Sequence, residues 1–112
     1  MAQKLGRFEE IVLLAILQLR GNAYGVTIRR QIETKARQKT SYGAIYTTLE
    51  RLERKGYVSS RKGEATAERG GRAKKYYRVE DAGLRALDDV HAIQGEMTLG
   101  LDLVLEPARV PV

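Results

Sequence analysis

Residues 40–79 constrain the fold of this chain more than any other stretch. A helix-sized segment with a polar start and an apolar stripe is followed directly by two short runs with strand-like alternation, and the connection between those runs is rich in glycine and arginine. A helix followed by a basic hairpin is typical of a recognition helix and a β-wing. This stretch therefore predicts a surface that holds nucleic acid.

The predicted recognition helix begins after Ser41, whose hydroxyl can accept a free backbone N–H of the first turn, and ends before Gly56, a residue type that commonly stops helices. Ile45, Leu49 and Leu52 recur at helical spacing and predict its buried stripe. The N-terminal part and the outward side of such a helix face DNA. The candidate DNA contacts on this helix are Ser41, Tyr42, Gly43, Tyr46, Thr47 and Arg51.

The start of this helix suits phosphate better than base edges. Gly43 removes bulk, so that the backbone can come near a duplex, and the free N–H groups at the helix start favour an anion. The hydroxyls of Tyr42 and Tyr46 can donate to phosphates. We therefore expect modest base contacts from the helix, with much of the affinity supplied elsewhere.

The two predicted strands span residues 57–62 and 73–79, and residues 63–72 connect them. Cationic side chains on and beside this hairpin can reach along the DNA backbone, and one arginine could enter a narrow minor groove. Tyr76 and Tyr77 are expected to pack inside the protein and not to stack on bases. The candidate wing contacts are Arg72, Lys74 and Lys75.

Two helices are predicted before this stretch, at residues 8–19 and 24–34. The first is apolar on most of its sides and must therefore be covered on two faces, one by the core and one by a further surface such as a partner subunit. The second has Val26, Ile28 and Ile32 as its expected inward residues. The predicted fold is mainly α with a two-stranded β-wing, a winged helix-turn-helix domain over residues 1–79.

A C-terminal helix is predicted over residues 80–106, followed by a tail at 107–112. Its apolar residues recur at spacings of 4, 3 and 4, as in a coiled-coil seam. A small three-helix domain offers little surface to cover such a seam, so we expect a dimerisation helix; the alternative is a helix that folds back onto its own domain. The candidate dimerisation residues are Phe8, Val12, Ala86, Val90, Ile93, Met97 and Leu101.

The net charge changes sign between the predicted winged domain and the predicted C-terminal helix. Residues 1–79 carry 18 Lys/Arg and 7 Asp/Glu, a net charge of +11, whereas residues 80–112 carry 2 and 7, a net charge of −5. The chain has no cysteine and a single histidine, and no motif of a metal site, a nucleophile or a phosphate-cradling loop. We therefore expect no enzyme activity, no cofactor and no metal. No signal peptide is evident and the apolar run at residues 11–19 is too short to span a bilayer, which favours a cytoplasmic protein without membrane contact.

Three motifs resemble those of the PadR family of bacterial transcriptional regulators: residues 21–25 (GNAYG), residues 41–46 (SYGAIY) and residues 70–78 (GGRAKKYYR). The single short C-terminal helix resembles the small subfamily. The resemblance implies a homodimeric winged-helix repressor of a palindromic promoter, with two recognition helices in successive major grooves of double-stranded DNA. It also implies release of DNA by a small aromatic or cationic effector at or near the dimer interface.

Three features depart from the family pattern. Tyr42 stands where the family often has proline, Glu80 stands where a threonine usually caps the last helix, and the chain has no tryptophan. Sandwiching of a flat effector between tryptophans is therefore not expected. The place left for an effector is a dimer-interface cavity, and its binding residues stay unassigned. Residues that could line it are Phe8, Val12, Val90 and Met97.

Two other functions compete with a DNA-binding regulator. A winged helix can serve as a protein-interaction module without a DNA target, because fold does not fix function. Binding to random duplex DNA at low salt separates these two hypotheses. An RNA-binding function is disfavoured, because no aromatic platform for unstacked bases is evident.

Overall fold

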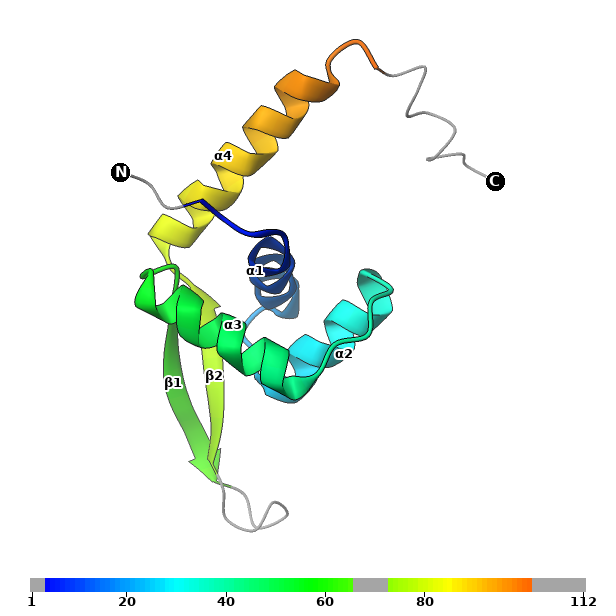
Figure 1. Cartoon of the computed structure of the whole chain (residues 1–112). Coiled ribbons are helices and arrows are strands. Elements are labelled where there is room, and N and C mark those ends of the chain that lie inside the picture. Colours follow the sequence, from blue (N-terminus) through cyan, green and yellow to red (C-terminus); the bar gives the residue numbers. More distant parts are fainter. Residues whose placement is uncertain (1–3, 66–72, 102–112) are drawn as a thin grey trace.

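The computed structural model describes residues 4–65 and 73–101 and has, in those residues, four helices and a two-stranded antiparallel sheet (Figure 1). The predicted mainly α fold with a β-wing is confirmed. The elements in chain order are α1 (Arg7–Leu19), α2 (Gly25–Lys35), α3 (Tyr42–Arg54), β1 (Val58–Ala65), β2 (Ala73–Val79) and α4 (Asp81–Thr98).

The core lies where α1, α2 and α3 pack together. The predicted inward stripe of α3 is confirmed, because Ile45, Leu49 and Leu52 are fully buried. Ser41 caps this helix by accepting a hydrogen bond from the backbone N–H of Ala44 at 3.1 Å. The other fully or almost fully buried aliphatic residues in the described part of the chain are Val12, Leu13, Ala15, Ile16, Ala23, Ile28, Ile32 and Val58.

The inward face of α2 differs from the prediction at its first turn. Val26 is only half-buried, and Thr27 is buried beside Ile28 instead. Thr27 can be buried because its hydroxyl is satisfied: it accepts from the backbone N–H of Tyr24 at 3.0 Å and donates to the carbonyl of Asn22 at 2.6 Å. This polar group fixes the start of α2.

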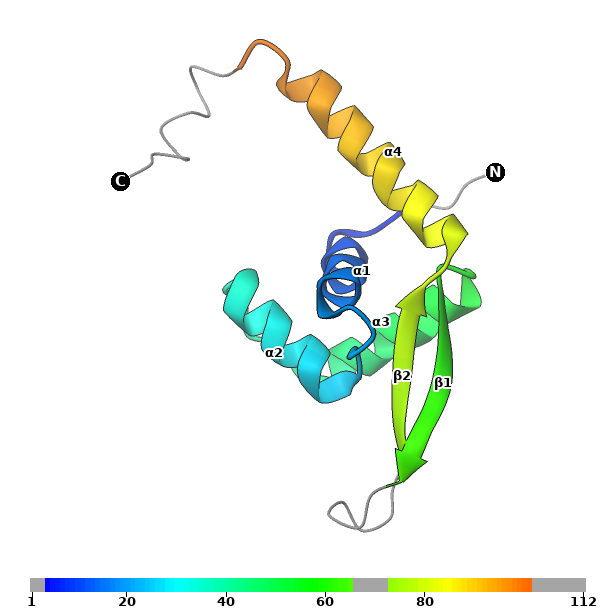
Figure 2. The same ribbon diagram turned by 180° about the vertical axis from the view of Figure 1, so that it is seen from behind.

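The sheet is joined to the helices at its root. β1 and β2 pair in register from Val58 opposite Val79 to Lys62 opposite Lys75, with an irregularity beyond Lys62. The backbone N–H of Tyr77 donates to the carbonyl of Ala23 at 2.8 Å, which attaches β2 to the loop before α2. Figures 1 and 2 show the sheet extending away from the helices. Residues 66–72, between the two strands in sequence, lie outside the described part of the chain.

α4 leaves the domain on the side opposite the far end of the sheet (Figures 1 and 2). Its first turn is closely packed, since a Cβ at Gly83 would lie 2.5 Å from the carbonyl oxygen of Tyr57. Its second half does not fold back onto the domain: Ile93 is 64% exposed and Met97 is 73% exposed.

α4 is shorter than predicted. The helix ends at Thr98, because the chain turns out of helical conformation at Leu99 and takes a positive φ of 83° at Gly100. Leu101 is therefore outside the helix, and residues 102–112 lie outside the described residues. Within the described segments, each helix is too short or too polar to cross a membrane.

α1 has the two-faced character that its composition predicts. Leu14 and Leu17 are exposed on one side, while Val12 and Leu13 on the other side are fully buried. Val12 is thus a core residue with no surface to offer a second subunit, and it is not part of the dimer face that we propose below. Phe8 is half-buried against the core.

Candidate nucleic-acid interface

The start of α3 is exposed and stiffened by stacked side chains. The rings of Tyr42 and Tyr46 are stacked, with centroids 6.4 Å apart and planes at 25°. The guanidinium of Arg29, on α2, lies over the ring of Tyr42 at 4.5 Å from its centroid. Ser41, Gly43 and Thr47 are exposed on the same end of the helix. The structure therefore brings five of the six predicted helix contacts together and adds Arg29 to them.

Arg29 is held by a second group. Its Nε lies 3.2 Å from the Glu33 carboxylate one turn along α2, and that carboxylate also accepts from the backbone N–H of Thr40 at 3.4 Å. Contact with Tyr42 and then with Glu33 raises the pKa of the Arg29 guanidinium. These contacts tie α2, the turn after it and the start of α3 into one unit. The sequence did not single out Arg29, because its partner Tyr42 is on another helix.

Two glycines on this surface, Gly25 and Gly43, differ in the space available for a side chain. A Cβ at Gly25 would collide with the hydroxyl and ring of Tyr46, so glycine there allows the Tyr46 ring to lie against the start of α2. Gly43 has no such neighbour, because a Cβ there would meet nothing closer than the Ser41 hydroxyl at 3.8 Å. The interior of the protein therefore does not require glycine at position 43.

The root of the wing is built from alternating aromatic and cationic side chains. Tyr76 of β2 makes an edge contact with Tyr24 at the start of α2, with centroids 5.4 Å apart. Arg61 lies over the Tyr76 ring at 4.9 Å, and the Lys74 ammonium lies over the Tyr24 ring at 4.5 Å. A Cβ at Gly63 would lie 2.5 Å from the Tyr76 ring. Of the two tyrosines predicted to pack inside the protein, Tyr77 is buried, whereas Tyr76 is half-buried against Tyr24. The rings of Tyr76 and Tyr24 each orient a cation.

Lysines face each other across the wing. Lys62 of β1 is directly opposite Lys75 of β2, and both are exposed. Like charges in such a pair are destabilising by roughly 0.2–1 kcal/mol. Lys75 is only loosely compensated, with its Nζ 3.9 Å from a Glu53 carboxylate oxygen. A polyanion would relieve this repulsion. The alternation of side chains along β1 could have identified Lys62 as a wing contact. The predicted contact Arg72 lies outside the described residues.

Arg51 belongs to an ion-pair cluster that links α3 to α1. Glu9 is only 4% exposed. Its carboxylate accepts hydrogen bonds from the Lys55 ammonium at 2.9 Å and from the backbone N–H of Gly6 at 2.7 Å. The Arg51 guanidinium lies 3.7 Å from the same carboxylate. Burial disfavours the charged carboxylate, but the hydrogen bonds from Gly6 and Lys55 outweigh it and lower the pKa of Glu9. Arg51 is the outer member of this cluster: its side chain is 50% exposed, and it lies one turn beyond the exposed tyrosines.

Glu80 precedes α4 but holds the start of this helix by contacts other than a capping hydrogen bond. Its side chain makes no capping hydrogen bond to α4. Its carboxylate instead accepts from the Ser59 hydroxyl and from Arg78, and these two contacts lower the pKa of Glu80. The start of α4 is thus held to the sheet, and Gly83 completes the close fit. Among residues 4–65 and 73–101, no group of His, Asp or Glu side chains is arranged to hold a metal ion.

Three helices, a two-stranded wing and a cationic, tyrosine-bearing surface at the start of α3 define a winged helix-turn-helix protein of the DNA-binding type. The family comparison agrees: residues 13–89 match the transcriptional regulator PadR-like family, so the chain belongs to that family. It is a DNA-binding transcriptional regulator.

Solved structures of related proteins share the fold. A PadR-like transcriptional regulator from Bacillus cereus is 23% identical, with a TM-score of 0.68 over 88% of this chain and 90% of that chain. A PadR family transcriptional regulator from Eggerthella lenta is 28% identical, with a TM-score of 0.66 over 89% of this chain and 85% of that chain. A transcriptional regulator from Clostridium thermocellum is 22% identical, with a TM-score of 0.67 over 84% and 88%. No curated protein matches the sequence.

Proposed function

We propose that this protein is a homodimeric repressor that binds a palindromic operator in double-stranded DNA and that a small molecule releases it. The observation that carries the proposal is the division of the molecule into two ends. The start of α3 and the root of the wing carry tyrosines and cations, and the second half of α4 carries exposed apolar residues. Figure 1 shows α4 extending from the domain on the side opposite the wing.

If the protein binds DNA as proposed, the cations of the wing should contribute to the affinity for every duplex, whatever its sequence. Lys62→Ala removes one of two facing lysines and is expected to weaken binding to random duplex DNA while lowering the salt slope by about one. Arg85→Ala is the matched control, because it removes one exposed cation on α4. Fluorescence anisotropy at several salt concentrations measures both. Equal effects of the two variants would contradict the assigned interface, and a parent protein that binds no duplex at low salt would support a protein-interaction module instead.

The dimer part is supported by apolar residues without cover. Ile93 and Met97 are exposed on α4, one turn apart, and Leu14 and Leu17 are exposed on α1. Large exposed apolar residues on two helices are typical of an interaction surface. Ala86 and Val90 continue the same stripe of α4 toward the domain and are half-buried. Leu101 is exposed beyond the helix end. A second copy of the chain, presenting the same stripe, is the partner that this geometry suits.

Molar mass in solution tests the dimer. Met97→Asp places a carboxylate in the stripe and is expected to give a monomer or an unfolded chain. His91→Asp is the matched control, because His91 is exposed and lies off the stripe. Light scattering after size exclusion should show a dimer for the parent and for the control. A folded monomeric parent at micromolar concentration would overturn the homodimer.

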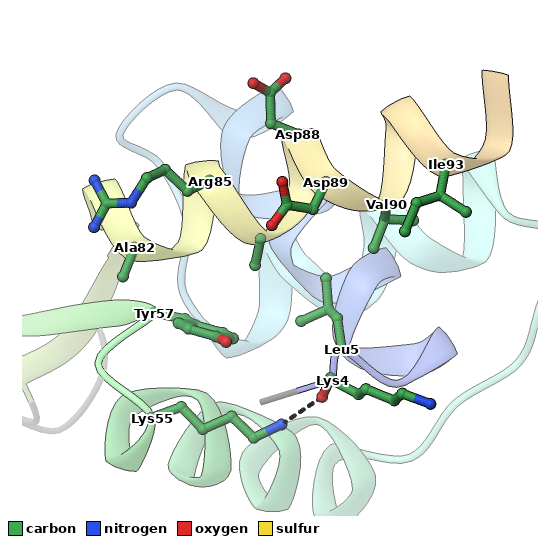
Figure 3. Close-up of a pocket in the computed structure, with 11 residues that line it drawn as sticks. Lys4, Leu5, Lys55, Tyr57, Ala82, Arg85, Asp88, Asp89, Val90 and Ile93 are labelled. Atoms are coloured by element: carbon green, nitrogen blue, oxygen red, sulfur yellow. Dashed lines mark hydrogen bonds between the residues drawn. The ribbon is translucent and has the colours of Figure 1, made fainter. Parts of the chain in front are cut away.

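A groove beside α4 is the candidate effector site. It has a volume of about 910 Å³ and is bordered by Leu5, Tyr57, Asp89, Val90 and Ile93, among others (Figure 3). In Figure 3 the Tyr57 ring lies along the groove while Asp88 points away from it. Asp89 supplies a negative charge beside apolar and aromatic surface, which suits an aromatic cation.

The groove also contains cations, and the structure shows where one of them is engaged. The Lys55 ammonium donates to the Lys4 carbonyl at 3.2 Å and to the Glu9 carboxylate (Figure 3). Its charge is therefore compensated by Glu9. Lys4 and Arg85 also border the groove, and Asp89 is the candidate for recognising a cation there. The groove shares Val90 with the cavity expected from sequence, whereas Val12 is buried in the core.

Phenyltrimethylammonium is a suitable probe, with benzoate as the anionic control. The cation is expected to raise the melting temperature of the free protein and to release DNA, and Asp89→Asn should remove both effects. Stabilisation by benzoate alone would contradict the assigned ligand class. Repression has a test of its own. A duplex that the protein selects from a random pool is placed across a promoter, and transcription in vitro from that promoter should fall when the protein is added. A rise in transcription would show an activator.

A further inference from the structure

The side chain of Arg29 has a more specific position than a surface cation requires. It lies on α2 but contacts α3 by stacking over the Tyr42 ring at 4.5 Å from the centroid. Its edge is held by Glu33 at 3.2 Å, and Glu33 is joined in turn to the backbone of Thr40 before α3. Arg29 is therefore fixed from two directions by groups on both sides of the turn.

Tyr42 is the first residue of α3, and the N-terminal residues of a recognition helix are the ones that reach base edges. Its ring contacts Arg29 and is stacked on Tyr46, and the Tyr46 ring is positioned by the absence of a side chain at Gly25. A side chain held in one geometry discriminates between partners better than one that must be ordered on binding. The stack thus prepares Tyr42 for contact with DNA.

We infer that Arg29 is a positioning residue for Tyr42: by fixing this ring at the start of α3, Arg29 sets the sequence preference for DNA. The inference rests on the proposed DNA-binding function and adds a specificity role for a residue on the preceding helix. It separates Arg29 from its neighbour Arg30, which is exposed and makes no ion pair with any residue in 4–65 and 73–101. Arg30 contributes charge, whereas Arg29 contributes charge and geometry.

The experiment compares two duplexes, one selected from a random pool by the parent protein and one with the same composition in scrambled order. The ratio of the two dissociation constants measures sequence preference. Arg29→Ala is expected to lower this ratio by about 2- to 5-fold, the range that a cation–π contact at an exposed site accounts for. Arg30→Ala should weaken binding to both duplexes equally and leave the ratio unchanged.

Two further variants separate positioning from charge and from direct reading of bases. Arg29→Lys keeps the charge but loses the planar stack, so the ratio should still fall. In a Tyr42→Ala background, Arg29→Ala should lower the ratio no further. An undiminished effect in that background would mean that Arg29 contacts bases itself, and equal behaviour of Arg29→Ala and Arg30→Ala would mean that it acts only as a charge; each result overturns the inference.

A measurement without DNA keeps the inference testable on its own. The aromatic resonances of Tyr42 in the free protein should shift in Arg29→Ala and stay in place in Arg30→Ala, with unchanged circular dichroism in both. If the parent binds no duplex, the proposed function fails even where these resonances shift. If the parent binds with sequence preference but the Tyr42 resonances do not respond to Arg29→Ala, the positioning role alone is overturned.

Discussion

Gly43 offers a sharp test of the interface, because stability and DNA binding should respond to it in opposite directions. It is the second residue of α3, and an added Cβ would meet only the Ser41 hydroxyl, at an ordinary contact distance of 3.8 Å. A glycine within a helix costs roughly 0.5–1 kcal/mol relative to alanine. The chain therefore carries a small instability at this position that no contact inside the protein explains.

The expected gain in stability from Gly43→Ala is about 0.5 kcal/mol, at the lower end of that range because the position lies in the first turn. At a fixed protein concentration this corresponds to a rise in melting temperature of about 2–4 °C. The DNA side responds oppositely, because the new methyl group stands between the helix backbone and the duplex. We expect at least about a tenfold loss of affinity, or about 1.4 kcal/mol.

Gly95→Ala is the matched control for this substitution. Gly95 is also helical, and a Cβ there would meet nothing within 4 Å. This control should stabilise the protein by up to about 1 kcal/mol and leave the affinity for DNA unchanged. Thermal denaturation and fluorescence anisotropy measure the two quantities. Parent-like affinity in Gly43→Ala would refute a close approach of the helix start to DNA, and a loss of stability would refute the open space seen at this position.

Three further predictions concern the contacts that shape the domain. Lys55→Met should cost about 3 kcal/mol of unfolding free energy in denaturant titrations, because it leaves the Glu9 carboxylate buried without its ammonium; Arg54→Met, at an exposed pair, should cost under about 1 kcal/mol, and equal losses would argue against a buried pair. The lowered pKa of Glu9 means that its ionised form stabilises the fold above the ordinary value of 4.5 and that this stability is lost as pH falls through the lowered pKa; the difference in stability between the parent and Glu9→Gln should therefore shrink on acidification below that value, and a constant difference would contradict it. Gly25→Ala should destabilise the domain and displace the Tyr46 ring, visible as a shift of its aromatic resonances, whereas a neutral effect would be inconsistent with the collision found there.

The sequence predicted the elements that depend on local pattern. Helical spacing identified the buried stripe Ile45, Leu49 and Leu52, and the capping preference of serine identified Ser41, because both signals are contained in a few consecutive residues. The glycine at position 56 stops α3 with a positive φ of 78°, as expected. The order of these elements, three helices and then two strands, predicted the winged helix-turn-helix.

Contacts between distant residues were not predictable in this way. Arg29 on α2 stacks on Tyr42 of α3, and Tyr24 at the start of α2 contacts Tyr76 on β2. Spacing carries no signal for such pairs, since each partner looks like an ordinary surface residue in its own element. The buried carboxylate of Glu9 was missed for the same reason: its cation, Lys55, lies at the end of α3.

The same contacts connect the DNA-binding end of the molecule to its apolar end. α1 carries the exposed Leu14 and Leu17 on one face, and its first turn is fixed to the end of α3 by Glu9 and Lys55. A buried ion pair with several hydrogen bonds resists sliding, because breaking it leaves a charge unpaired. In the proposed dimer, the packing of α1 and α4 against the second copy would therefore set the separation of the two α3 helices, and a change in that packing would move them as units.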